Sequence, residues 1–165
     1  MRALGIDPGT GRCGFGIVDK RGNALTAEDY GVIETFPDMP AVERLHVVYA
    51  GVRQLIETYE PDVMGVETLY FNRNITTAIA VAQARGVILL AGYEAGLPIL
   101  ECTPLQVKQQ VAGYGRAEKS QVIDMTMRIM HIKERIDPDD AADALAIGLT
   151  AIYRTEHKAV YRRGL

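Results

Sequence analysis

The sequence of 165 residues has no tryptophan, only two cysteines and only three histidines. Cys13 and Cys102 form no Cys-x-x-Cys pair and match no metal-ligand spacing, so we expect two reduced, small apolar side chains. No apolar run is both long and uncharged enough to span a bilayer, and the N-terminus lacks a signal-peptide pattern. We therefore expect a cytoplasmic protein without membrane contact.

The chain also lacks an excess of basic residues, since its net charge is −3 and its pI is about 5.6. Such a balance is unusual for a nucleic-acid-binding protein. Two bound Mg²⁺ ions would, however, bring the charge to about +1. Between Leu105 and Arg135 basic residues exceed acidic ones by three. The basic residues of this segment are Lys108, Arg116, Lys119, Arg128, Lys133 and Arg135.

The length fits one domain, and the residue pattern predicts an α/β fold. Three antiparallel strands come first, and further strands then alternate with helices, which predicts a mixed five-stranded sheet flanked by helices. We expect one domain over residues 1–155 and a mobile basic tail over 156–165. The expected strands are 2–7, 13–18, 24–35, 63–66 and 98–100, and the expected helices are 40–59, 75–95, 104–111, 117–130 and 138–153.

The expected helix over residues 75–95 is apolar nearly all round. A helix without a polar face packs against a neighbour on both sides. A two-fold homodimer interface would supply the second neighbour. The alternative is a central helix that is covered within the monomer.

Four carboxylates stand where a protein of this size would normally place apolar side chains. Asp7 and Glu67 each follow an apolar strand, while Asp140 and Asp143 share one face of the last long helix. No Lys or Arg adjoins any of the four in the sequence. Because an uncompensated buried carboxylate is costly, a hard divalent cation such as Mg²⁺ is the economical partner.

Each acid also has a purely structural interpretation. Asp7 precedes the turn Pro8-Gly9, Glu67 ends a strand, and Asp137-Pro138-Asp139-Asp140 is typical of a helix start with Asp137 as N-cap. Asp143 is not explained by capping, since it is the only charged residue between Asp140 and Arg154. One metal site explains the placement of all four acids more simply than four independent structural roles do.

The four acids together indicate phosphoryl chemistry by two metal ions, which clamp the attacking and leaving oxygens of a phosphodiester. Asp7 is the natural bridging ligand, because a sheet strand holds it rigidly. Such hydrolysis needs no histidine pair, and His46, His131 and His157 are scattered. The pattern therefore predicts a metal-dependent nuclease in which Asp7, Glu67, Asp140 and Asp143 are the catalytic metal ligands.

Candidate DNA contacts lie in two segments. Tyr70, Phe71 and Arg73 directly follow Glu67 and suit stacking on unpaired bases, although Phe71 could equally pack into the core. Lys108, Arg116 and Lys119 surround the turn at residues 113–115 and could reach phosphates. The glycine-rich turn 9–11 could also cradle a backbone phosphate, but it is not a P-loop, because no Gly-Lys-Ser/Thr follows.

Several stretches together resemble bacterial RuvC-type Holliday junction resolvases of the ribonuclease H-like superfamily. The resemblance covers nearly the whole chain and includes the acids in their local contexts. The matching stretches are residues 4–9, 83–87, 106–109, 115–122 and 140–146.

The resemblance implies a ribonuclease H-like fold and a homodimer that nicks four-way DNA junctions symmetrically, in recombination and DNA repair. It implies that Asp7, Glu67, Asp140 and Asp143 bind Mg²⁺, two ions per subunit with Mn²⁺ able to substitute. It places Tyr70 where the family has an aromatic residue at the crossover, and it assigns DNA contacts that support catalysis to Lys108 and Lys119. It also implies a branch-migration helicase complex as partner.

Three alternatives remain open from the residues. An actin-like phosphotransferase would need a second domain of similar size and a second phosphate loop, and ATP binding would identify it. A junction-binding module without activity would show no metal-dependent turnover. A related nuclease could act on a different nucleic acid.

Overall fold

The computed structural model describes residues 1–69 and 75–163. Three strands come first, and the remaining two strands alternate with helices, as the sequence predicts. The strands are β1 (Arg2–Asp7), β2 (Arg12–Arg21), β3 (Ala24–Glu34), β4 (Val63–Glu67) and β5 (Ile99–Cys102). The helices are α1 (Ala41–Tyr59), α2 (Ile75–Glu94), α3 (Pro104–Ala112), α4 (Lys119–Ile129) and α5 (Asp139–Arg163).

The five strands form one mixed sheet in the order β3-β2-β1-β4-β5. The three N-terminal strands pair antiparallel, while β4 runs parallel to both β1 and β5. The predicted mixed sheet is thereby confirmed. Because β1 and β4 are parallel neighbours, their carboxyl ends lie side by side at the same edge of the sheet.

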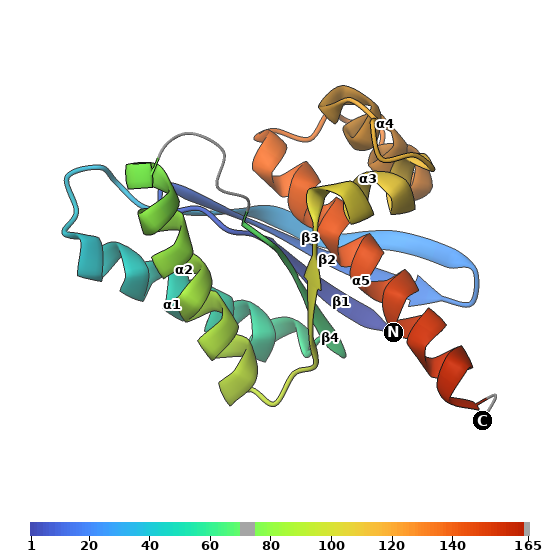
Figure 1. Ribbon diagram of the computed structural model, residues 1–165, viewed down its shortest axis with the longest axis horizontal. Coiled ribbons are helices and arrows are strands. Elements are labelled where there is room, and N and C mark those ends of the chain that lie inside the picture. Colours follow the sequence, from blue (N-terminus) through green and yellow to red (C-terminus); the bar gives the residue numbers. More distant parts are fainter. Residues whose placement is uncertain (70–74, 164–165) are drawn as a thin grey trace.

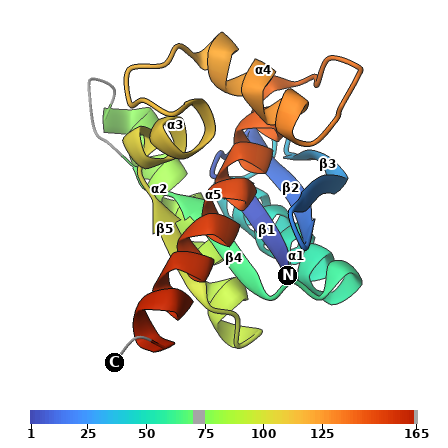
Figure 2. The same cartoon turned by 90° about the vertical axis from the view of Figure 1, so that its right-hand side faces the viewer.

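Helices cover the two faces of the sheet unequally. Helices α1 and α2 lie on one face, and α5 crosses the other face with α3 and α4 beside its N-terminal half (Figures 1 and 2). Side chains of β1 alternate between two apolar cores, since Ala3 belongs to the α5 side whereas Leu4 and Ile6 belong to the α1–α2 side. The sheet is therefore buried on both faces, as its apolar strands predict.

Glycines allow α5 to lie directly on the sheet. A Cβ atom on Gly5 would stand 2.0 Å from the carbonyl oxygen of Ala144, and one on Gly16 would stand 2.8 Å from the backbone nitrogen of Leu145. Any side chain at these strand positions would push the helix away. This close packing fixes the position of the first turns of α5, where Asp140 and Asp143 lie.

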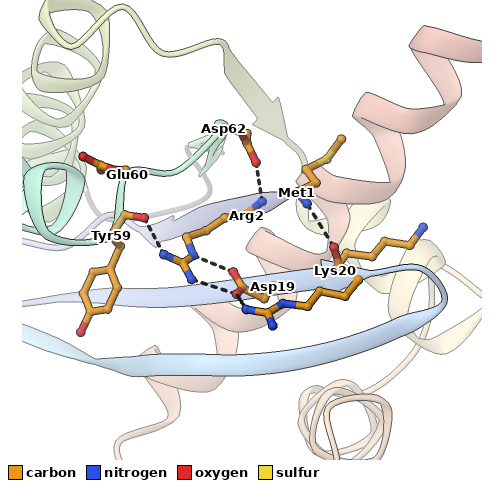
Figure 3. A pocket seen from close by; sticks show the side chains of 8 residues that line it. Met1, Arg2, Asp19, Lys20, Tyr59, Glu60 and Asp62 are labelled. Carbon is orange, nitrogen blue, oxygen red and sulfur yellow. Dashed lines mark hydrogen bonds and ion pairs between the residues drawn. The ribbon is translucent and has the colours of Figure 1, made fainter.

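An ion pair ties the opposite end of the sheet together (Figure 3). The Arg2 guanidinium donates to both carboxylate oxygens of Asp19, at 2.6 and 2.9 Å, and to the carbonyl oxygen of Tyr59 at 2.8 Å. The backbone N–H of Arg2 donates to Asp62. These contacts join β1, β2 and the end of α1 at the end of β1 that lies farthest from Asp7.

The C-terminal helix is longer than its pattern predicts. We expected a helix over 138–153, whereas α5 begins at Asp139 and continues to Arg163, through most of the expected tail. The mobility of residues 156–165 stays a prediction. Of the helices in the described chain, none is long and apolar enough to cross a membrane.

Candidate active site

The carboxyl ends of two neighbouring parallel strands supply the first two acids. Asp7 is the last residue of β1, and Glu67 is the last residue of β4. The register pairs Ile6 with Val66, so the two acids follow paired positions of adjacent strands. The residues that precede them, Ala3–Ile6 of β1 and Val63–Val66 of β4, are apolar and buried, whereas Asp7 and Glu67 are partly exposed.

The first turns of α5 supply the other two acids. Asp7 pairs with Gly14 across the β1–β2 ladder, and a Cβ on Gly14 would lie 2.1 Å from the carbonyl oxygen of Asp140. The start of α5 therefore rests on the strand beside Asp7. Asp143 lies one turn further along and lines the same cleft as Glu67. The structure thus brings Asp7, Glu67, Asp140 and Asp143 together from three separate elements.

Burial and mutual repulsion disfavour the ionised forms of Asp7, Glu67 and Asp143. Desolvation, followed by the charges of Glu67, Asp143 and Asp140, raises the pKa of Asp7 to about 8. Desolvation and then the charge of Asp143 raise the pKa of Glu67 to about 7. Burial also raises the pKa of Asp143, although Lys119 opposes the rise. The site therefore concentrates negative charge that lacks full compensation.

Two cations from distant parts of the chain give partial compensation. Lys119 Nζ lies 2.9 Å from Asp143 Oδ2 and 3.7 Å from Asp139 Oδ2. Burial lowers the pKa of Lys119, but its hydrogen bond to Asp143 and the nearby negative charges outweigh this effect and raise it. Arg12 NH1 lies 3.7 Å from Asp140 Oδ2. The sequence shows no basic residue adjoining the acids, whereas the fold brings these two beside them.

A cleft of about 280 Å³ opens beside Glu67 and Asp143. Its polar lining consists of Glu67, Asp143, Lys108 and Lys119, so acids and cations face the same space. The rest of the wall is apolar and consists of side chains from α3, α4 and α5. The apolar lining residues are Pro104, Val107, Val122 and Ile147.

The donor set fits a hard divalent cation. All four candidate ligands are carboxylates, which are the ligands that Mg²⁺ and Mn²⁺ prefer, and a dication would relieve the repulsion that raises the pKa of Asp7 and Glu67. As they stand, no three Asp, Glu, His or Cys side chains in the described part of the chain gather closely enough to hold an ion. Repulsion among the acids and the contact of Lys119 with Asp143 are consistent with that spacing.

The structure places the expected DNA-contact residues unequally. Lys108 and Lys119 line the cleft. Arg116 is exposed in the connection between α3 and α4. Tyr70, Phe71 and Arg73 lie outside the described residues.

Sequence reasoning gave no role to two arginines near the acids. Arg12 follows the turn after Asp7 and reaches Asp140. Arg85, on α2, donates from Nε to the carbonyl oxygen of Glu67 at 2.9 Å. Arg85 belongs to one of the stretches that carry the family resemblance, but spacing alone gave no indication that it contacts β4.

Comparison with known proteins gives consistent matches. The family model described as crossover junction endodeoxyribonuclease RuvC matches residues 3–151. A crossover junction endodeoxyribonuclease RuvC from Brevibacillus brevis is 53% identical over 150 residues, which cover 91% of this chain and 90% of the relative.

Solved structures agree with these sequence matches. The Thermus thermophilus RuvC structure is 36% identical, with a TM-score of 0.87 over 96% of this chain and 97% of that one. The T. thermophilus RuvC in complex with a Holliday junction substrate, also 36% identical, has a TM-score of 0.90 and covers 96% of each chain.

Proposed function

The chain belongs to the RuvC family of crossover junction endodeoxyribonucleases, which are metal-dependent nucleases, and from this premise we propose that it resolves four-way DNA junctions by paired, symmetric nicks. The observation that carries the proposal is the convergence of Asp7, Glu67, Asp140 and Asp143 at one end of the sheet. Such work belongs to homologous recombination and DNA repair, and in a bacterium it takes place in the cytoplasm.

We propose that the four carboxylates hold two Mg²⁺ ions per subunit, which Mn²⁺ can replace. Bound ions would supply an activated water and stabilise the leaving oxygen of the phosphodiester. Asp7 is best suited to bridge them, because the sheet pairing on both sides of β1 fixes its backbone. The pKa of Asp7 is raised in the metal-free protein because gathering the acids before the ions bind costs free energy when they are ionised.

The cations of the site would bind the DNA backbone. Lys119 balances Asp143 in the free protein, and its ammonium group is close enough to the acids to contact a scissile phosphate. Lys108 lines the same cleft from α3, and Arg116 extends the basic surface. Of the residues whose placement is not described, we propose that Tyr70 stacks on bases at the crossover and that Phe71 and Arg73 support it.

We propose that two copies associate through α2. Its buried face includes Ala84, Ile88 and Ala91, whereas Leu90 and Tyr93 are 48% and 77% exposed. Exposed apolar side chains gathered on one helix are typical of an interface. A homodimer would present two active sites to a junction that itself has two-fold symmetry, and a branch-migration helicase complex is the expected partner on the DNA.

The test is cleavage of an end-labelled synthetic four-way junction in Mg²⁺ or Mn²⁺, beside linear duplex of the same sequence. We expect paired nicks on the junction alone and none with Asp7→Asn, which keeps the size of the side chain and removes its charge. Arg53→Gln is the matched control, because Arg53 pairs with Glu57 and Glu94 on exposed helix surfaces. Junction binding without cleavage in either metal would reject the enzyme and indicate a binding module.

A further inference from the structure

Arg85 connects α2 to the catalytic end of the sheet. Its Nε atom donates to the carbonyl oxygen of Glu67 at 2.9 Å, and its NH2 atom pairs with the Glu101 carboxylate on β5. The Arg85 side chain is only 16% exposed, whereas that of Glu101 is 55% exposed. One guanidinium from a covering helix therefore contacts the last residue of β4 and the penultimate residue of β5.

The carbonyl group that Arg85 binds belongs to the last residue of β4. Beyond Glu67 the ladder continues for one more backbone bond, from the Thr68 N–H to the carbonyl oxygen of Cys102. A strand end with few ladder bonds can shift more easily than the strand interior. The hydrogen bond from Arg85 restrains the backbone of Glu67 from the α2 side.

A second arginine holds the neighbouring strand from the opposite face of the sheet. Arg154 of α5 donates from NH1 to the carbonyl oxygen of Glu101 at 3.0 Å and to Gln106 Oε1 at 2.8 Å. Arg154 therefore restrains the backbone of the residue whose carboxylate pairs with Arg85. The restraint on Glu67 thus rests on β5 as well as on α2.

From these contacts we infer that Arg85 is a positioning residue that sets the direction of the Glu67 carboxylate for metal binding. Groups that orient a metal ligand without touching the metal change metal affinity or activity roughly 10–100-fold when they are removed. Of the four acids, Glu67 is the one whose backbone Arg85 contacts, so an effect of Arg85 on metal binding should pass through Glu67. The inference rests on the proposed function, because it requires Glu67 to bind metal.

The experiment measures Mn²⁺ binding to the full chain by isothermal titration calorimetry, and junction binding in EDTA alongside it. Arg85→Gln is expected to weaken Mn²⁺ binding about 10-fold or more and to leave junction affinity unchanged. Raising the concentration of Mg²⁺ should recover part of its junction cleavage. Arg53→Gln, the same change at a more exposed arginine, on α1, should leave all three measurements unchanged.

Two further variants separate positioning from folding. Arg85→Lys keeps a positively charged donor group. Its Mn²⁺ affinity should therefore lie between those of Arg85→Gln and the wild type. Glu101→Gln removes the ion pair but leaves the hydrogen bond from Arg85 to Glu67. It should therefore weaken Mn²⁺ binding less than Arg85→Gln does. These milder variants also test the inference if Arg85→Gln does not fold.

A double-mutant cycle gives the decisive result. In a Glu67→Gln background, adding Arg85→Gln should cause no further loss of Mn²⁺ affinity, because the two residues act through one ligand. Wild-type affinity in Arg85→Gln, or an equal loss in both backgrounds, would overturn the inference while leaving the nuclease proposal intact. A wild-type protein that neither binds Mn²⁺ nor cleaves the junction would overturn both.

Discussion

Gly14 and Asp140 approach so closely that a Cβ atom on Gly14 would lie 2.1 Å from the Asp140 carbonyl oxygen. Gly14 is the ladder partner of Asp7, so this contact sets how near the start of α5 comes to the end of β1. The missing side chain is therefore what brings acids from two distant parts of the sequence together.

Gly14→Ala should therefore damage both the fold and the proposed metal site. We expect a loss of at least about 1–3 kcal/mol of unfolding free energy, because the backbone of α5 must move to accept the methyl group. Thermal unfolding in EDTA measures the loss, and calorimetry with Mn²⁺ should show weaker binding. Gly11→Ala is the control, since a Cβ there would meet only the Arg44 side chain, at an ordinary contact distance of 3.7 Å. Equal melting temperatures for the wild type and Gly14→Ala would contradict the packing argument.

Asp7→Asn should stabilise the metal-free protein while abolishing cleavage. The pKa of Asp7 is raised from 3.8 to about 8, so the folded state binds this proton more tightly than the unfolded state. Its contribution is fully present at low pH and is lost as pH rises between about 4 and 8. In EDTA the melting temperature of Asp7→Asn should exceed that of the wild type by a margin that grows across this window. A margin independent of pH would show that Asp7 ionises normally.

Lys119→Met should shift the pH dependence of cleavage as well as slow it. Lys119 opposes the rise in the pKa of Asp143, so its removal should raise that pKa further. The acid limb of the pH–rate profile should then move to higher pH, with a rate loss of roughly 10–100-fold at neutral pH. Lys119→Arg should keep the wild-type limb, because it retains the charge. A slower rate with an unmoved limb would assign Lys119 to phosphate binding alone.

The sequence could predict the elements because each carries a local signal. The helical spacing over 75–95 corresponds to α2 at Ile75–Glu94, and the alternation of strands and helices led to the observed mixed sheet. The four acids were identifiable for the same reason, since each interrupts or ends an apolar run.

The partners of these acids could not be predicted, because they come from elements that are far apart in the sequence. Lys119 lies on α4, yet its closest acidic contact is Asp143 on α5. Arg85 lies 18 residues from the carbonyl group that it binds. Glycines within β1 and β2 were a usable signal, since Gly5, Gly14 and Gly16 interrupt strands only where a neighbouring backbone comes close.

Leu90→Glu should convert the proposed homodimer to monomers. Leu90 is 48% exposed on α2, and a buried carboxylate facing its symmetry mate would be costly. Sedimentation equilibrium measures the change in mass. Leu105→Glu is the control, because Leu105 is similarly exposed, at 54%, but lies on α3 on the other side of the sheet (Figure 1). If the wild type sediments as a monomer, or Leu90→Glu as a dimer, α2 is not the interface.

Asp19→Asn should destabilise the fold without affecting the active site. The Arg2 guanidinium lowers the pKa of Asp19, whose side chain is only 8% exposed, so the pair stabilises the protein above the ordinary pKa near 4. We expect the free energy of unfolding to fall by about 1–3 kcal/mol at neutral pH. This loss shrinks as pH falls and the wild-type carboxyl takes up its proton.

Glu57→Gln, which breaks an exposed pair on α1, is the control and should lower the free energy of unfolding by less than about 1 kcal/mol. Urea unfolding at pH 7 and pH 3 compares the two losses. Asp19 lies on β2 opposite Arg2, at the other end of the β1–β2 ladder from Asp7, so Mn²⁺ affinity should be unchanged. A fall in that affinity would mean that strain at this end of β1 reaches the four candidate acids.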